Sequence, residues 1–337
     1  MFKKTILEKL RTFDFWIKLS TWTLFILYMV GYWDFQHYLL ENTWGQYGFS
    51  RLSIICMLTV LTLLPYSLAH KFNLPVSWYS IAFFPSVILT CLLAQEQISI
   101  TVAIISIVAM AIVATVATIK PRLPKIVITS NGCIFIIMII YSHSISNTDE
   151  LDHYKCKIIN QLNHQQYSEA LKTGNTSLDV DTTIFQLRAT AMIRNNSLGD
   201  QLFKYPIPFG VTKIDTNQAT SATEAKDIIL CNLLLQKKLY TFISQLRKYY
   251  DINSPNLPQH YKEAIILYLS KTVNTNLSYN DPTTLANYND FIIEKNKHKT
   301  TLIRSNYCRN LYGTTYFWYY HFFPLPITKK YDQQTKN

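Results

Sequence analysis

Histidines and carboxylates are the residues of this chain whose spacing could support acid–base or metal chemistry. His260 and Glu263 are three residues apart. On a helix, this spacing places two side chains on one face, one turn apart. Such a pair could bind a metal ion or shuttle a proton. The same spacing is typical of a hydrogen bond on a helix surface, and the sequence favours that second interpretation.

The other histidines are weaker candidates. His153 and His164 lie across one predicted helix, and no third ligand accompanies them. His321 lies among tyrosines, which favours a packed ring over a catalytic base. The sequence contains no HExxH, GxSxG, P-loop or GxGxxG string. We therefore assign no catalytic, cofactor-binding or metal-binding residue, and the sequence favours a non-enzymatic role.

These candidates belong to a chain with two unlike halves. Five apolar segments crowd the first half, and a helix needs about 20 mostly apolar residues to cross a bilayer. The fifth segment is the weakest, because Ser130, Asn131 and Gly132 lie near its start. The segments predict a five-helix transmembrane domain at residues 1–145, with helices at about 15–33, 52–69, 76–94, 98–119 and 126–142.

Basic residues between the apolar segments predict the orientation in the membrane, because Lys and Arg concentrate in cytoplasmic loops. If all five segments span, nine basic residues of the N-terminal arm and the loops lie on one face of the membrane. Arg51 is the only basic loop residue on the other face. The N-terminus is therefore predicted to be cytoplasmic, and the C-terminal half periplasmic, in a bacterial inner membrane. The basic residues on the cytoplasmic face are Lys3, Lys4, Lys9, Arg11, Lys18, Lys71, Lys120, Arg122 and Lys125.

Residues 146–337 predict a soluble domain that is entirely helical. Apolar residues recur there at spacings of three and four, as on one face of a helix. Asn147 with Glu150 and Ser221 with Glu224 have the form of capping boxes, and Asp281–Pro282 has the form of a helix start. We expect helices at 148–163, 165–174, 181–194, 197–204, 222–236, 238–250, 257–273, 282–296 and 300–321.

Short helices with short connections are typical of stacked helix pairs. The string QYSEAL, residues 166–171, resembles the middle of a tetratricopeptide repeat, in which a tyrosine and an alanine wedge two helices together. Two further pairs follow at irregular spacing, interrupted by the connection 205–220, which we interpret as an Ω-like surface loop. The aromatic residues from Tyr307 to Phe323 predict a C-terminal cap, packed on the preceding helices or docked at a membrane interface.

Charge and cysteine content narrow the function classes further. The net charge is +11, and the excess in the second half is spread along the helices. This pattern favours a solvated surface over nucleic-acid binding. Cys156, Cys231 and Cys308 of the second half are far apart in sequence, so they admit at most one disulfide and no spacing indicates zinc.

Three strings carry a resemblance to a known family: LGDQLF at 198–203, LPQHYKEA at 257–264 and TYFWYY at 315–320. In these strings the chain resembles an uncharacterised family of bacterial inner-membrane proteins. Members of that family combine a polytopic N-terminal half with a tetratricopeptide-like helical tail. They have more membrane segments than the five predicted here, so the first half departs from the pattern. The resemblance implies a fold and no activity.

Two functions remain. The first is a membrane-anchored scaffold whose stacked helices bind a protein in the cell envelope. The second is an envelope transferase or carrier that acts on a lipid-linked substrate at the outer membrane–water interface. Its only candidate residues are Asp34, His37 and Glu41, between the first two segments. We favour the scaffold. The bilayer and a protein are the expected partners, and no cofactor or nucleic acid is expected.

Overall fold

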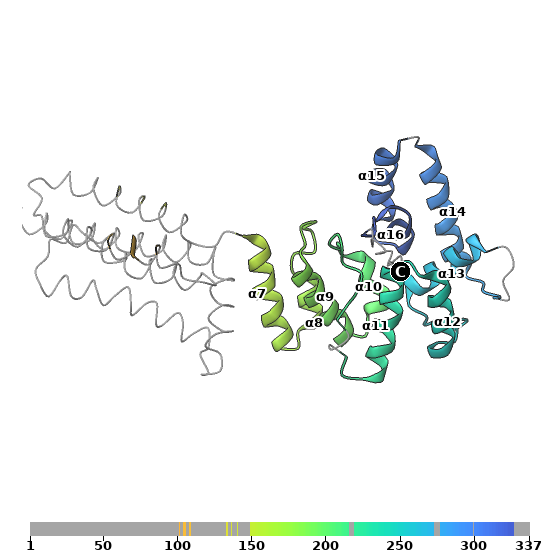
Figure 1. Ribbon diagram of the computed structural model, residues 1–337, viewed down its shortest axis with the longest axis horizontal. Helices are drawn as coiled ribbons and strands as arrows, with labels where there is room; N and C mark the ends of the chain where they lie inside the picture. Colours follow the sequence, from red (N-terminus) through yellow and green to blue (C-terminus); the bar gives the residue numbers. More distant parts are fainter. Residues whose placement is uncertain are drawn as a thin grey trace, which may run out of the picture. The chain divides into compact units, whose positions relative to one another are not determined.

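The computed structural model describes residues 149–215, 219–272, 277–298 and 300–326 (Figure 1). The chain divides into two compact units, Met1–Asn160 and Gln161–Asn337. Within the part of the chain that the structure describes, no helix combines the length and the apolar character that crossing a bilayer requires. The predicted membrane segments lie outside the described ranges, apart from the isolated helical residues Thr101, Ile104, Ile105, Val108, Cys133, Ile136 and Ile140.

The described ranges are helical, in agreement with the all-α prediction. They contain ten α-helices, one short 3-10 helix and no strand. The helix predicted at 197–204 is divided into a single α-helical turn and the 3-10 helix η3. The elements are α7 (Glu150–Asn163), α8 (Tyr167–Lys172), α9 (Thr182–Arg194), α10 (Leu198–Gln201), η3 (Leu202–Lys204), α11 (Ala222–Leu235), α12 (Leu239–Tyr249), α13 (Gln259–Lys271), α14 (Pro282–Lys297), α15 (Thr301–Tyr312) and α16 (Tyr316–Phe322).

Capping side chains explain where two of these helices begin. The Ser221 hydroxyl accepts a hydrogen bond from the backbone N–H of Glu224 (3.2 Å) at the start of α11. The Asp281 carboxylate accepts one from the N–H of Thr284 (3.0 Å) at the start of α14, where Pro282 occupies the first turn. Each cap satisfies an N–H group that has no partner within its helix. Both predicted helix starts are confirmed.

The single helix predicted at 300–321 is wrong, because the chain breaks it between Tyr312 and Tyr316. Thr315 is responsible: its backbone is extended, and its hydroxyl oxygen accepts a hydrogen bond from the N–H of Trp318 (3.3 Å). The same hydroxyl donates to the carbonyl of Tyr312 (2.7 Å). The break lets α16 fold back so that it contacts both α13 and α15 (Figure 1).

Neighbouring helices pack as pairs, and α13 contacts two of these pairs as well as α10 and α16. Contacts link α8 with α9, α11 with α12, and α14 with α15. Helix α13 contacts α10, α12, α14 and α16. Its side chains Tyr261, Ala264, Ile265 and Leu267 are fully buried. The core of the second unit is therefore built around α13, and two polar side chains of that helix, His260 and Glu263, are enclosed in it.

The connection at 205–220 differs from the predicted Ω-like surface loop. In its described parts, 205–215 and 219–220, the side chains of Val211 and Ile214 are buried. The side-chain amide of Asn232 on α11 accepts a hydrogen bond from the N–H of Ile214 (2.6 Å) and donates one to its carbonyl (3.2 Å). These paired bonds satisfy the backbone of a segment that has no secondary structure of its own. The connection is thus fastened onto α11.

Candidate functional site

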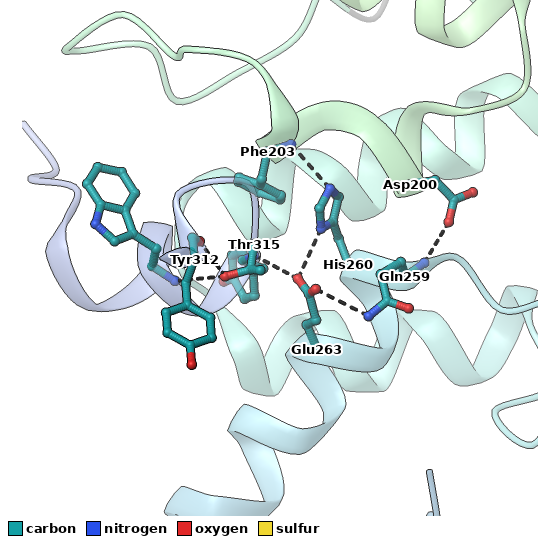
Figure 2. Close-up of polar contacts among 9 residues, drawn as sticks. Asp200, Phe203, Gln259, His260, Glu263, Tyr312 and Thr315 are labelled. Atoms are coloured by element: carbon teal, nitrogen blue, oxygen red, sulfur yellow. Dashed lines mark hydrogen bonds and ion pairs between the residues drawn. The ribbon is translucent and has the colours of Figure 1, made fainter. Parts of the chain in front are cut away.

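His260 and Glu263 form the predicted pair, but they lie inside the domain. The Nδ1 atom of His260 is 3.0 Å from Oε2 of Glu263. The two side chains are on α13 and are almost completely enclosed, at 1% and 3% exposed. The predicted hydrogen bond is confirmed, whereas its predicted position on a helix surface is wrong. Figure 2 shows the pair with Gln259 of the same helix and with Asp200, Phe203, Tyr312 and Thr315 around it.

The Glu263 carboxylate is surrounded by hydrogen-bond donors. Its Oε2 atom accepts from the backbone N–H of Tyr316 (2.7 Å), and its Oε1 atom accepts from the side-chain amide of Gln259 (3.3 Å). His260 provides the third contact. A buried carboxylate needs such donors to replace the water that it has lost. Because the Tyr316 N–H belongs to the first turn of α16, Glu263 fixes the position at which α16 begins.

The His260 ring makes two hydrogen bonds of opposite sense. Its Nδ1 atom faces the Glu263 carboxylate and donates, while its Nε2 atom accepts from the backbone N–H of Phe203 (3.4 Å). A ring that donates at one nitrogen and accepts at the other is a neutral imidazole. The Phe203 ring packs edge-on against it, with centroids 5.0 Å apart. Protein groups occupy both nitrogens, so neither is open to a metal ion or a substrate.

Helix α10 is joined to the start of α13 by a second set of contacts. The Asp200 carboxylate accepts a hydrogen bond from the backbone N–H of Gln259 (2.7 Å) and so caps α13 from another helix (Figure 2). Gly199 permits this close approach. A Cβ atom at Gly199 would lie 2.7 Å from Cβ of Pro258 and 2.9 Å from Cζ of Tyr261. Only a residue without a side chain fits at this position.

Aromatic residues of α16 complete the enclosure. Tyr316, Phe317 and Tyr319 are at most 2% exposed, which agrees with packing of the aromatic ending on the preceding helices. The hydroxyl of Tyr316 donates to the carbonyl of Leu234 (3.2 Å), and that of Tyr319 to the carbonyl of Leu235 (2.8 Å). Both carbonyls are in the last turn of α11, and that of Leu234 also accepts from the backbone N–H of Lys237 (2.9 Å). Burial raises the pKa of both phenols, which keeps them protonated as donors.

A second polar cluster lies beside Tyr261, and sequence reasoning missed it. The Asp227 carboxylate accepts hydrogen bonds from the hydroxyls of Tyr250 (2.6 Å) and Tyr261 (3.0 Å). Burial raises the pKa of Asp227, although the two tyrosine hydrogen bonds oppose that rise. The Cys231 thiol, 3.5 Å from the Tyr261 hydroxyl, is fully buried, and burial raises its pKa. A protonated, enclosed thiol is not a nucleophile.

The remaining candidates are not brought together into a site. His153 is part of α7, and His164 follows the end of that helix. Asp34, His37 and Glu41 lie outside the described residues. Across the described ranges, no group of three or more His, Cys, Asp or Glu side chains is placed to hold a metal ion. The three cysteines of the second half, Cys156, Cys231 and Cys308, form no disulfide with one another.

The three strings that carry the family resemblance meet at this junction. Residues 198–203 provide Gly199, Asp200 and Phe203, residues 257–264 provide the His260–Glu263 pair, and residues 315–320 begin α16. We call these groups the α13 junction. Because its polar atoms are enclosed and paired with one another, the junction holds four elements together and offers no open active site.

Comparisons with known proteins match one part of the chain. A family model described as a family of unknown function (DUF6057) matches residues 211–323, about one third of the chain. The matched span contains the second and third strings and extends just past the end of α16. No curated protein and no solved structure matches the chain. An uncharacterised family is thus consistent with the resemblance, while its membrane domain and tetratricopeptide-like character stay predictions for this chain.

Proposed function

We propose that this protein is a membrane-anchored scaffold whose helical domain binds a protein partner in the cell envelope. The observation that carries the proposal is the contrast between the interior and one surface of the domain. The polar groups of the α13 junction are enclosed and used to hold helices, whereas the α14–α15 hairpin presents large apolar side chains to solvent. On α15 these are Leu302, Ile303, Tyr307 and Leu311, at 69, 55, 44 and 55% exposed.

The exposed residues of α15 have the spacing of a binding stripe. Ile303, Tyr307 and Leu311 recur every four residues, so they lie along one face of the helix. Leu285 and Ile293 of α14 are exposed as well, so both helices of the hairpin contribute. Exposed apolar surface of this kind is typical of protein-binding sites. An amphipathic helix face fits an apolar groove or helix of a partner.

The membrane anchor and the type of repeat belong to the same proposal. The five apolar segments support an anchor with a cytoplasmic N-terminus and a periplasmic helical domain. The QYSEAL string supports a tetratricopeptide-like arrangement, since its Ala170 and Leu171 are buried where α8 packs on α9. A periplasmic position would place the α14–α15 hairpin among envelope proteins.

Photo-crosslinking in living cells tests the scaffold. The photoreactive amino acid benzoylphenylalanine would replace Ile303 in the full chain. A matched control would carry it at Tyr240, which is 77% exposed on α12. We expect a discrete protein adduct from position 303 that position 240 does not give. The adduct should disappear in the variant L302D/L311D, which removes two apolar side chains of α15, while the protein still accumulates.

Two results would contradict the scaffold. One is a set of adducts that is identical from both positions, because a specific surface must distinguish α15 from α12. The other is an adduct at position 303 that persists unchanged in L302D/L311D, because the apolar stripe would then play no part in holding the partner.

A further inference from the structure

Three lysines gather around the end of α16, and each comes from a different element. Lys237 is in the turn between α11 and α12, Lys271 is in the last turn of α13, and Lys295 is in the last turn of α14. They are far apart in sequence and meet only in the folded domain. Lys271 is exposed, and the other two are partly exposed, so the cluster is open to solvent.

The rings of Tyr320 and His321 are the shared centre of this cluster, with centroids 5.6 Å apart. The Nζ atoms of Lys271 and Lys237 lie 4.4 and 5.7 Å from the Tyr320 centroid. The hydrogen-bond partners are all neutral: Lys271 donates to the Tyr320 hydroxyl (3.2 Å), Lys295 to Nδ1 of His321 (3.0 Å), and Lys237 to the carbonyl of Phe323 (2.6 Å).

No carboxylate of the described residues lies within 4.0 Å of these three ammonium groups. Elsewhere in the domain, lysines do find carboxylates, as Lys172 does with Glu169 (2.7 Å) and Lys262 with Asp281 (3.7 Å). The cluster at the end of α16 therefore concentrates positive charge without a matching negative charge.

The ionisation of the cluster reflects this imbalance. Burial and then the charge of Lys271 lower the pKa of Lys237 to about 8. Burial, followed by Arg304 and Lys271, lowers the pKa of Lys295. Burial and then the three lysines lower the pKa of His321 to about 4. Burial is the main cause in each group, and the neighbouring positive charges add to it; an anion would relieve the repulsion between these charges.

The backbone carbonyls at the end of α16 account for the position of only one of the three lysines. The carbonyl groups at the end of a helix attract cations, and Lys237 donates to one of them. Lys271 and Lys295 instead contact a phenol and an imidazole, so the helix end does not account for them. We propose that Lys237, Lys271 and Lys295 form a binding site for a phosphate group. A phosphate offers several oxygens and a negative charge to several ammonium groups at once.

The phosphate could belong to a soluble phosphate compound or to the headgroup of an anionic lipid, and the test separates these sources. The full chain would be placed in nanodiscs of zwitterionic phosphatidylcholine. Binding of inorganic phosphate would be followed by calorimetry, and melting would be compared in phosphate and chloride at equal ionic strength. We expect phosphate to bind and to raise the melting temperature, because a ligand stabilises the state that binds it.

The lysine variants assign the effect to the cluster. K237Q/K271Q/K295Q should lose the stabilisation by phosphate. The control K204Q/K238Q/K248Q changes the net charge equally at exposed lysines and should keep it. If the cluster variant does not fold, the single variant K271Q removes one exposed side chain and should weaken phosphate binding about tenfold, which is about 1.4 kcal/mol.

Nanodiscs that also contain phosphatidylglycerol form the lipid arm. If the headgroup is the ligand, hydrogen exchange of residues 316–323 should slow in phosphatidylglycerol discs, in the wild type and the control but not in the cluster variant. The proposal is overturned if neither inorganic phosphate nor phosphatidylglycerol distinguishes the wild type from the cluster variant. It is equally overturned if the control variant loses the effect to the same degree.

Discussion

The two ends of α16 contact the rest of the domain in opposite ways. At its first turn, the N–H of Tyr316 donates to the enclosed carboxylate of Glu263. At its last turn, Lys237, Lys271 and Lys295 approach from three elements and find only neutral partners. Both ends carry the charge that the helix dipole favours. At the first end, the Glu263 carboxylate has its hydrogen-bond donors within the protein. At the second end, the three ammonium groups have no negatively charged partner among the described residues. The first end is therefore a structural contact, and the second is a candidate binding site.

The largest expected effect is loss of the carboxylate at the first end. E263A would leave the buried N–H of Tyr316, the buried Nδ1 of His260 and the partly buried amide of Gln259 without their acceptor. We expect it to reduce the free energy of opening of α13 and α16 by about 3 kcal/mol or more. Hydrogen exchange of these helices measures it. E169A, which removes an exposed ion pair with Lys172, should cost less than about 1 kcal/mol. Equal costs would show that Glu263 does not hold α16.

The close approach of α10 to α13 provides the next test of the same end. G199A adds a Cβ atom where Pro258 and Tyr261 leave no room. We expect a loss of about 2 kcal/mol from overpacking, measured by the same exchange experiment. Gly210 is a useful comparison because it has a positive φ of 88° and open space around it. G210A should cost about 1 kcal/mol from its backbone alone. The reverse order would contradict the close contact.

Acidification tests the second end, and its expected effect is the smallest. The pKa of His321 is lowered to about 4, first by burial and then by Lys295 and the other lysines. Between pH 6.5 and 4 the unfolded chain therefore binds a proton that the folded domain does not. Stability from this group is present above pH 6.5 and falls as the pH drops toward 4. We expect a loss of about 1 kcal/mol, because the partly exposed ring is screened by solvent.

Thermal melting at several pH values between 4 and 7 measures this dependence. H321Q removes the titrating ring and should flatten the change of melting temperature with pH. If the melting temperatures of the wild type and H321Q depend on pH in the same way, His321 has an ordinary pKa. That result would contradict a concentration of positive charge at the last turn of α16.

Sequence reasoning predicts the parts of this fold whose signals are local. The caps at Ser221 and Asp281 each span four residues, so the sequence contains the whole signal. Thr315 has the same kind of signal, but tyrosines and apolar residues continue on both sides of it and favour one uninterrupted helix. The break at Thr315 became apparent only because the structure packs α16 back against α13.

The α13 junction shows where local reasoning ends. The spacing of His260 and Glu263 predicts their hydrogen bond, because both atoms belong to one helix. The partners at Phe203 and Tyr316 are backbone N–H groups, which almost every residue carries, so no residue type identifies them. Gly199 is required only because Pro258 lies next to it in space. The lysine cluster could not be predicted from the sequence either, because its members lie at three separate helix ends that meet only in the folded domain.

The order in which the junction is assembled has a consequence for synthesis of the protein. Glu263 leaves the ribosome 53 residues before Tyr316. At a translation rate of about 5–20 residues per second, the Tyr316 N–H that donates to this carboxylate is synthesised roughly 3–10 s later. In a polypeptide released before residue 316, α16 would be absent and the Glu263 carboxylate on α13 would stay exposed to water. Such a product would open readily at α13 and be degraded by proteases.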